Sequence, residues 1–394
     1  MAYLTPGEQV AVSASKVLIR VAASLVLCLG LGAGWAVCAR AQDAQAGSLD
    51  GAWTATAETS AKDATPARTT ESHSKSGNRS VDKQRVEVLG PNGVYQPDSE
   101  TETETIQVNA STTRTVVRRY TWDANGRKKL AQVTEEDAQN TAAGDGRTVR
   151  TTSSSDLNGN LHVVQREVAD TKKTSPEAQE TKTTVYVADG NGGFLTTRQT
   201  KEVQTRGADN SVEEKKITLV PDGNGNFKVS EVKDKTIKEE GKTRTSEERV
   251  SRPDLDGRLS ESSRTVSKET ETGEGEKSET VDVYSKDVPG LTGDGQEHLN
   301  TRVVTVQKKD ASGETGERKV EQYNSGNPGD GRQVREKTKY VVKYGGSGTH
   351  DTKTVQGRDI NGNMNVTSVE TRKSDQRPPA PAPAPAPPSP EKPQ

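Results

Sequence analysis

The stretch Asp222-Gly223-Asn224-Gly225-Asn226 decides the fold, because its glycine belongs to a series that recurs along most of the chain. Each glycine of the series follows an Asn or Asp, and successive glycines lie 33, 33, 33, 33, 32, 38, 36 and 31 residues apart. The nine glycines are Gly93, Gly126, Gly159, Gly192, Gly225, Gly257, Gly295, Gly331 and Gly362. A fixed period of this length indicates a repeat architecture.

The repeated motif has the chemistry of a turn between antiparallel strands. In six repeats an Asp precedes the glycine by three positions, which gives the pattern D-x-[ND]-G; these are Asp123, Asp156, Asp189, Asp222, Asp254 and Asp359. An Asp at the first position of a turn accepts hydrogen bonds from the backbone, and glycine adopts a positive φ without a Cβ clash. Six repeats place a bulky apolar residue two positions after the glycine: Tyr95, Leu161, Phe194, Phe227, Leu259 and Met364. We expect these residues to form a packing stripe between adjacent hairpins.

Each repeat is interrupted a second time near its middle, and strand-forming residues lie between the interruptions. Gly144-Asp145-Gly146 and Ser175-Pro176 are two such interruptions, whereas Thr183–Val187 and Tyr340–Tyr344 are rich in β-branched and aromatic residues. Short runs of this composition between turn residues predict β-strands. Two strands of about 11 residues per repeat predict about nine hairpins in an up-and-down antiparallel meander, with tight turns at one edge and looser loops at the other.

The composition limits how such strands can pack. The chain is 28% hydrophobic, 3% aromatic and 28% charged, with a net charge of −2, whereas globular domains are typically about 45–50% apolar. We therefore expect a single-layer or thinly packed, extended sheet, held by cross-strand polar pairs. The shortage of apolar residues argues against an outer-membrane barrel, whose strands need an apolar lipid-facing side. The competing interpretation is a largely disordered chain.

The first 41 residues resemble an export signal. Lys16 and Arg20 precede a mostly apolar run that ends in Ala39-Arg40-Ala41, which is the layout of a cleavable signal peptide. A retained membrane anchor is the alternative, since about 18 apolar residues can just cross a bilayer. Cys28 and Cys38 both lie in this segment, so we expect the mature protein to contain no thiol and no disulfide.

These features predict four regions: residues 1–41 as a signal peptide, 42–80 as a flexible N-terminal lead-in, 81–374 as the β-hairpin repeat region, and 375–394 as a disordered Pro/Ala-rich tail. The tail alternates Pro and Ala from Pro379 to Pro387, a composition typical of extended polyproline II segments. The predicted location is outside the cytoplasm: periplasm, cell surface or extracellular medium.

No motif for catalysis or cofactor binding is apparent. His73, His162, His298 and His350 fall in different repeats without metal-ligand spacing, so we predict no catalytic, cofactor-binding or metal-binding residues, no cofactor and no enzymatic activity. Calcium is the one ion to consider, because Asp156–Asn160 alternates oxygen-bearing side chains as an EF-hand loop does at its start. The sixth position of that loop needs glycine, and Leu161 stands there instead. Hydrogen-bonded turns are the alternative interpretation.

The sequence therefore predicts an exported, non-enzymatic repeat protein that acts as an extended structural, spacer or surface-interaction element. The alternative is a secreted or periplasmic binding module that uses variable inter-strand loops and is stabilised by calcium. The partner is unknown, with a cell-envelope polymer or another protein as candidates. We expect no nucleic-acid partner, since the net charge is slightly negative, and no membrane contact once the signal peptide is removed.

Overall fold

The computed structural model describes residues 52–61, 64–123, 125–273, 275–286, 296–324, 331–345 and 348–374. All regular structure in these residues is β-strand, and no helix among them is long and apolar enough to cross a membrane. The predicted signal peptide and Pro/Ala-rich tail lie outside the described residues. The strands are β1 (Ala52–Ala61), β2 (Ala64–Ser76), β3 (Arg79–Leu89), β4 (Tyr95–Asn109), β5 (Thr112–Trp122), β6 (Lys128–Asn140), β7 (Gly146–Ser155), β8 (Leu161–Ser175), β9 (Ala178–Ala188), β10 (Phe194–Arg206), β11 (Val212–Pro221), β12 (Phe227–Glu240), β13 (Thr243–Pro253), β14 (Leu259–Gly273), β15 (Glu276–Ser285), β16 (His298–Asp310), β17 (Gly313–Tyr323), β18 (Arg332–Gly345), β19 (Gly348–Arg358) and β20 (Met364–Ser374).

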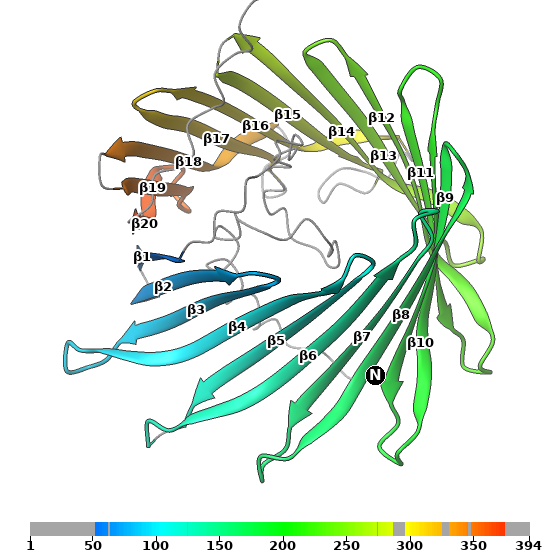
Figure 1. Ribbon diagram of the computed structural model, residues 1–394. Helices are drawn as coiled ribbons and strands as arrows, with labels where there is room; N and C mark the ends of the chain where they lie inside the picture. Colours follow the sequence, from blue (N-terminus) through cyan, green and yellow to red (C-terminus); the bar gives the residue numbers. More distant parts are fainter. Residues whose placement is uncertain are drawn as a thin grey trace, which may run out of the picture. The chain divides into compact units, whose positions relative to one another are not determined.

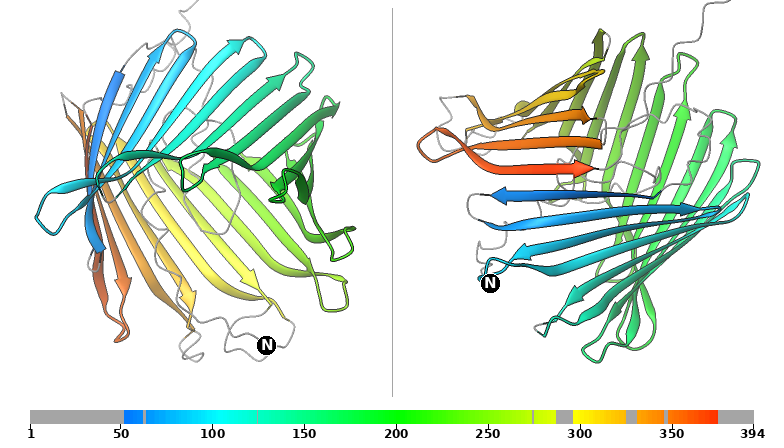
Figure 2. Two further views of the ribbon diagram at one scale, coloured as in Figure 1. Left: turned by 90° about the horizontal axis from the view of Figure 1, so that it is seen from below. Right: turned by 60° about the vertical axis from the view of Figure 1, so that its left-hand side comes forward.

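The twenty strands form one closed antiparallel barrel (Figures 1 and 2). Each strand pairs with its neighbours in sequence, and β1 also pairs with β20, from Ala55↔Ser374 to Ala61↔Ser368. The predicted all-β antiparallel meander is confirmed, and the alternative of a largely disordered chain is not supported. The predicted open, extended sheet is wrong, because the first and last strands meet and leave no free edge.

The strands begin earlier than the sequence predicts. β1 and β2 form a hairpin within residues 42–80, the segment that we expect to be a flexible lead-in. This hairpin has no D-x-N-G turn, so the glycine period could not reveal it. It makes the count ten hairpins instead of nine, and it supplies the strand to which β20 pairs.

The connections gather at two rims of the barrel. All nine glycines of the series belong to connections from an odd-numbered strand to the next even-numbered one, and we call that end the D-x-N-G rim. Seven of the ten connections at this rim span five residues between strands. At the opposite rim, seven of nine connections span only two residues, such as Gly77-Asn78 and Gly241-Lys242. The predicted looser loops are thus tight hairpin turns in most repeats, because glycine and asparagine form two-residue turns as readily as loops.

A bulge recurs in every even-numbered strand from β4 to β20, just inside the D-x-N-G rim. One residue of each strand is skipped in the pairing with the preceding strand. The skipped residues are Asp98, Ala131, Val164, Thr197, Ser230, Ser262, Asn300, Arg335 and Thr367. Such bulges bend a strand and increase its twist, so nine in one row help to curve the wall.

The pairing register assigns alternate residues to opposite faces of the wall. Burial distinguishes the two faces. Eleven buried side chains lie in the described strands; nine of them share one face, and the other two, Val116 and Val232, lie on the opposite face. Side chains crowd on the concave side of a curved sheet, so the face with nine buried residues is the inner one. The nine are Ala55, Ala57, Glu71, His73, Val185, Ile237, Val250, Thr305 and Thr338.

Candidate functional site

The D-x-N-G turns are held by their aspartates through backbone hydrogen bonds. The Asp156 Oδ1 atom accepts from the backbone N–H groups of Asn158 and Asn160, both at 2.8 Å. The same pair of bonds recurs at Asp123, Asp189, Asp222, Asp254 and Asp359. The backbone N–H of Asn160, with the His162 side chain nearby, lowers the pKa of Asp156 to about 2.

These bonds engage the oxygens that the calcium hypothesis needs. In each of the six turns one carboxylate oxygen already accepts hydrogen bonds from two backbone N–H groups. The geometry therefore favours the alternative interpretation, in which the motif forms a hydrogen-bonded turn. Among the residues that the structure describes, no group of three or more His, Cys, Asp or Glu side chains is placed to hold a metal ion.

The four histidines stay apart, as their spacing predicts. His73 Nδ1 lies 2.6 Å from Asp82 Oδ1 on the inner face, and His162 Nε2 lies 3.1 Å from Asp156 Oδ2 at a turn. His298 begins β16 and His350 lies in β19. The structure therefore brings no two histidines together in one site.

The inner face is lined by hydroxyl groups and charged pairs. Hydroxyl pairs bridge neighbouring strands at Thr134–Thr152 (3.3 Å), Thr171–Thr181 (2.9 Å) and Ser246–Ser267 (2.8 Å). Such cross-strand pairs stabilise a sheet without an apolar core. Charges of both signs also face inward: Arg150 pairs with Glu136 and lies 3.7 Å from Glu167. The resulting surface is mostly polar, although valines such as Val281, Val303 and Val320 also face inward.

On the inner face, an ion pair joins β20 to β2 across the intervening strand β1, next to the point where the barrel closes. Arg372 Nη2 of β20 lies 3.3 Å from Glu71 Oε2 of β2, although β1 runs between them. The pair passes over Ala55 and Ala57, which are each 3% exposed and pair with the two charged residues. Two alanines in β1 leave the room that this contact needs. The Gln84 amide also donates to Glu71 at 3.0 Å.

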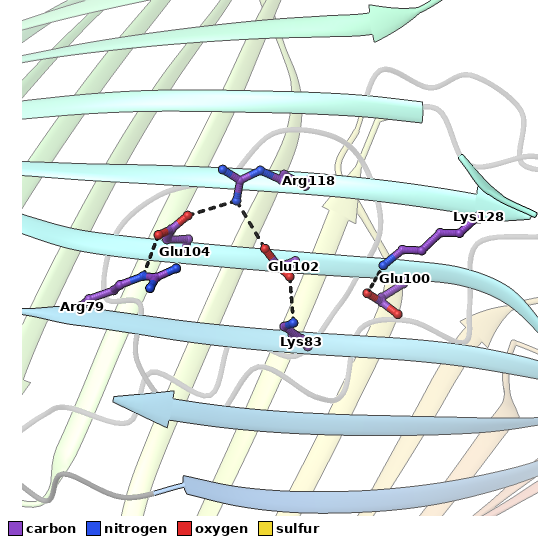
Figure 3. Close-up of polar contacts among 7 residues, drawn as sticks. All are labelled: Arg79, Lys83, Glu100, Glu102, Glu104, Arg118 and Lys128. Carbon is purple, nitrogen blue, oxygen red and sulfur yellow. Dashed lines mark hydrogen bonds and ion pairs between the residues drawn. The ribbon is translucent and has the colours of Figure 1, made fainter. Parts of the chain in front are cut away.

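The outer face of β3–β6 carries a charged network (Figure 3). Glu104 accepts from Arg79 (2.7 Å) and Arg118 (3.0 Å), and Glu102 lies 3.3 Å from Arg118. Glu102 also pairs with Lys83 at 3.0 Å, and Glu100 with Lys128 at 2.6 Å. In Figure 3 the opposite wall lies behind these strands, and the labelled side chains stand on the near side. The middle of the outer wall is therefore polar at β3–β6.

The wall encloses more space than its own side chains can fill. Twenty strands spaced about 4.8 Å apart and tilted by about 40° give a circumference of roughly 125 Å and, for a circular section, a diameter of roughly 40 Å between backbones. Barrels of eight strands are filled by their side chains, whereas those of 16–18 strands leave an aqueous channel. The wide interior could not be inferred from single turns.

No protein-family model and no curated protein matches the sequence. Among solved structures, the fold is similar to the copper transporter OprC, with 5% identity over 82% of this chain and 80% of that one and a TM-score of 0.41. It is also similar to OccK2 of Pseudomonas aeruginosa in complex with glucuronate (10% identity, 82% and 94% coverage, TM-score 0.37). A bacterial polysaccharide outer-membrane secretin matches with 7% identity, 84% and 99% coverage and a TM-score of 0.28.

The closed barrel corrects the predicted function. The spacer, structural and loop-binding interpretations all assumed an open sheet, whereas β1 pairs with β20 and the chain forms a closed barrel. Those interpretations, including the calcium-stabilised module, are wrong. The exclusion of a membrane is also wrong, since it rested on excluding a barrel. The closed barrel is compatible with the predicted export to the cell envelope.

Proposed function

We propose that the protein is a hydrophilic β-barrel channel of the cell envelope, in which polar solutes move along the barrel axis. The observation that carries this proposal is the pairing of β1 with β20, which turns a polar sheet into a closed wall with a separate interior. An open sheet with the same residues would expose both faces to the same solvent and could not separate two spaces.

The lining favours solutes that are small and polar. Inward-facing threonines and serines offer hydrogen-bond donors and acceptors, and acidic and basic side chains neutralise one another in pairs such as Arg150–Glu136 and Arg372–Glu71. A lining with both signs of charge does not build a strong field of one sign. We therefore propose passage with little preference between anions and cations.

Thr200 and Gln199 provide a matched pair of positions for a test. They are neighbours in β10, where Thr200 pairs with Thr218 and Thr183 on the inner face and Gln199 pairs with Leu219 and Thr184 on the outer face. The only cysteines of the chain, Cys28 and Cys38, lie in the predicted signal peptide. With both replaced by serine, Thr200→Cys and Gln199→Cys each introduce one thiol for labelling in the folded protein.

The experiment compares a small maleimide with one attached to a polymer too wide for the interior. We expect the small reagent to label both variants, and the large reagent to label Gln199→Cys at least roughly tenfold faster than Thr200→Cys. A Thr200→Cys variant that resists the small reagent while folded would show a filled interior and overturn the channel. Equal labelling of both variants by the large reagent would show that the wall does not enclose a space.

A further inference from the structure

The outer surface changes character close to the D-x-N-G rim, where apolar and aromatic side chains form two rows around the barrel. The row nearest the turns comes from the last outward residue of each odd strand and the first of each even strand. It contains Leu89, Tyr95, Trp122, Leu161, Ala188, Phe194, Pro221, Phe227, Pro253, Leu259, Tyr323 and Met364. The second row contains Pro97, Tyr120, Leu130, Val163, Tyr186, Leu219, Val229, Tyr284, Leu299, Val334 and Val366. Charged side chains interrupt both rows: Lys128, Arg332 and Arg358 in the first, and Glu87, Glu261 and Glu321 in the second. We call these two rows the collar.

The predicted packing stripe is part of this collar, and it faces solvent instead of other hairpins. Phe194 is 45% exposed and Leu259 51% exposed. The turns beyond the collar are apolar at their tips as well, because the second residue of D-x-N-G is Leu157, Leu255 or Ile360 in three repeats, and each is fully exposed. Of sixteen exposed large hydrophobic residues in the described chain, twelve lie within three residues of these turns, and three of the twelve (Val187, Leu195 and Val220) face the interior.

Basic side chains lie over the aromatic rings of the collar. Lys128 Nζ is 3.8 Å from the centroid of the Tyr120 ring and 5.9 Å from that of Trp122. Arg68 stands 4.1 Å above Tyr95, Arg85 5.7 Å from Trp122 and Arg264 4.3 Å from Tyr284. Each of these five contacts lies at this rim. Aromatic rings and basic groups are the side chains enriched where proteins meet lipid headgroups.

The collar is too short to cross a bilayer. Two rows of outward residues cover about 10 Å along the strands at about 3.3 Å per residue, whereas the apolar band of a membrane-spanning barrel is about 25 Å tall. Directly beyond the collar lie charged outer residues such as Glu102 and Arg118 of Figure 3. A depth of about 10 Å matches the boundary between lipid headgroups and acyl chains.

We propose that the D-x-N-G rim is a membrane-binding site: its turn tips and collar insert into the headgroup boundary of a bilayer. The tips and aromatic rings enter the apolar edge, and Lys128, Arg85 and Arg68 lie among the headgroups together with their ion-pair partners Glu100, Glu87 and Glu58. The opposite rim, with polar tight turns, stays in water. This inference goes beyond the proposed channel, since it concerns what the rim binds and not what the interior conducts.

Leu157, Leu255 and Ile360 allow the site to be weakened without disturbing the fold, because the tips contact nothing that their replacement would expose. The test variant combines Leu157→Ser, Leu255→Ser and Ile360→Ser. The matched control combines Val108→Thr, Val306→Thr and Val341→Thr, three exposed hydrophobic residues away from the D-x-N-G rim. Far-UV circular dichroism confirms that both variants retain β-structure before binding is measured.

Binding is measured by flotation with vesicles of phosphatidylcholine, with and without phosphatidylglycerol. We expect the unmodified full chain to float with the mixed vesicles, the tip variant to bind roughly tenfold or more weakly, and the control variant to bind as the unmodified chain does. Because the basic groups of the collar are paired with glutamates, omission of phosphatidylglycerol should leave binding of the unmodified chain nearly unchanged. Lipids brominated near the headgroup should quench Trp122 in a Trp35→Phe/Trp53→Phe background.

Three results would overturn the membrane site: undiminished binding of the folded tip variant, equal loss in the control variant, or a rim-to-rim dimer in solution that excludes vesicles. The channel proposal fails on a different result, the labelling of Thr200→Cys, which needs no lipid. Either proposal can therefore fail while the other stands.

Discussion

The two rims of the barrel are built from the same strands and differ in almost every property. At the D-x-N-G rim the turns repeat one hydrogen-bond pattern, a bulge follows each turn, and apolar side chains ring the outer face. At the opposite rim most turns have two residues, bulges appear in only three hairpins, and polar residues such as Asn78, Asp209 and Lys242 prevail. One rim is thus uniform and apolar, whereas the other is varied and polar.

The difference shows that turn geometry is repeated at the rim where the height of each turn sets the position of the collar. At the opposite rim, where the turns only reverse the chain, the geometry varies. A collar works as a ring if its turns end at similar heights, and the Asp-anchored five-residue turn fixes that height in six of the ten hairpins. Hairpins at the opposite rim need only to reverse the chain, which several turn types accomplish equally well.

Replacement of the glycine in a D-x-N-G turn should have the largest effect on the stability of the barrel. Gly225 has a φ of +83° with open space around it, whereas Gly223 of the same turn has no positive φ. Gly225→Ala should therefore destabilise the barrel by about 1–2 kcal/mol, the cost of the left-handed region for a residue with a Cβ. Gly223→Ala should be neutral or stabilising by about 0.5 kcal/mol. Urea unfolding measures both, and equal effects would refute the fixed turn geometry.

Replacement of the bulge residue next to a D-x-N-G turn should have an intermediate effect on stability. The Ser230 hydroxyl donates to the Thr218 carbonyl oxygen at 3.2 Å, and Thr197, Ser262 and Thr367 make the same bond in their repeats. Ser230→Ala should reduce the free energy of unfolding by about 0.5–1 kcal/mol through loss of this bond. Ser230→Thr should retain stability, because threonine already occupies this place in two repeats. Equal losses in both variants would show that the hydroxyl contributes nothing.

Protonation of a turn aspartate at low pH should have the smallest effect on stability, and it distinguishes the two rims. The pKa of Asp156 is lowered to about 2 by backbone N–H groups of the turn, so its contribution to stability is complete above the unfolded pKa of about 3.9 and is lost as the pH falls towards 2. The urea midpoint of the unmodified protein should exceed that of Asp156→Asn at pH 7, and the gap should close near pH 2.

Glu177→Gln at the opposite rim controls for the removal of one negative charge. Its midpoint should not reproduce the pH-dependent gap of Asp156→Asn. A gap for Asp156→Asn that persists unchanged down to pH 2 would contradict the role of the ionised carboxylate.

Much of the fold was predictable from the sequence because it is local. The period of Gly93, Gly126 and Gly159 places the turns, and the motif Asp222–Gly225 explains how each turn is held. The bulges were missed, although a Ser or Thr five residues after the glycine at Thr197, Ser230, Ser262 and Thr367 could have revealed them. The membrane was excluded because apolar content was averaged over whole strands, and the collar concentrates it at one end.

The sequence by itself determined the hairpin: a turn chemistry, a strand length and an apolar residue at a fixed distance from each turn. Only the tertiary structure decided that the hairpins close, and therefore which face is inside and which rim can meet a lipid surface. Closure depends on twist and bulges summed over twenty strands, and it is completed by contacts such as Arg372–Glu71, between residues 301 positions apart. No local pattern encodes that sum, because each hairpin contributes only a small part of the curvature.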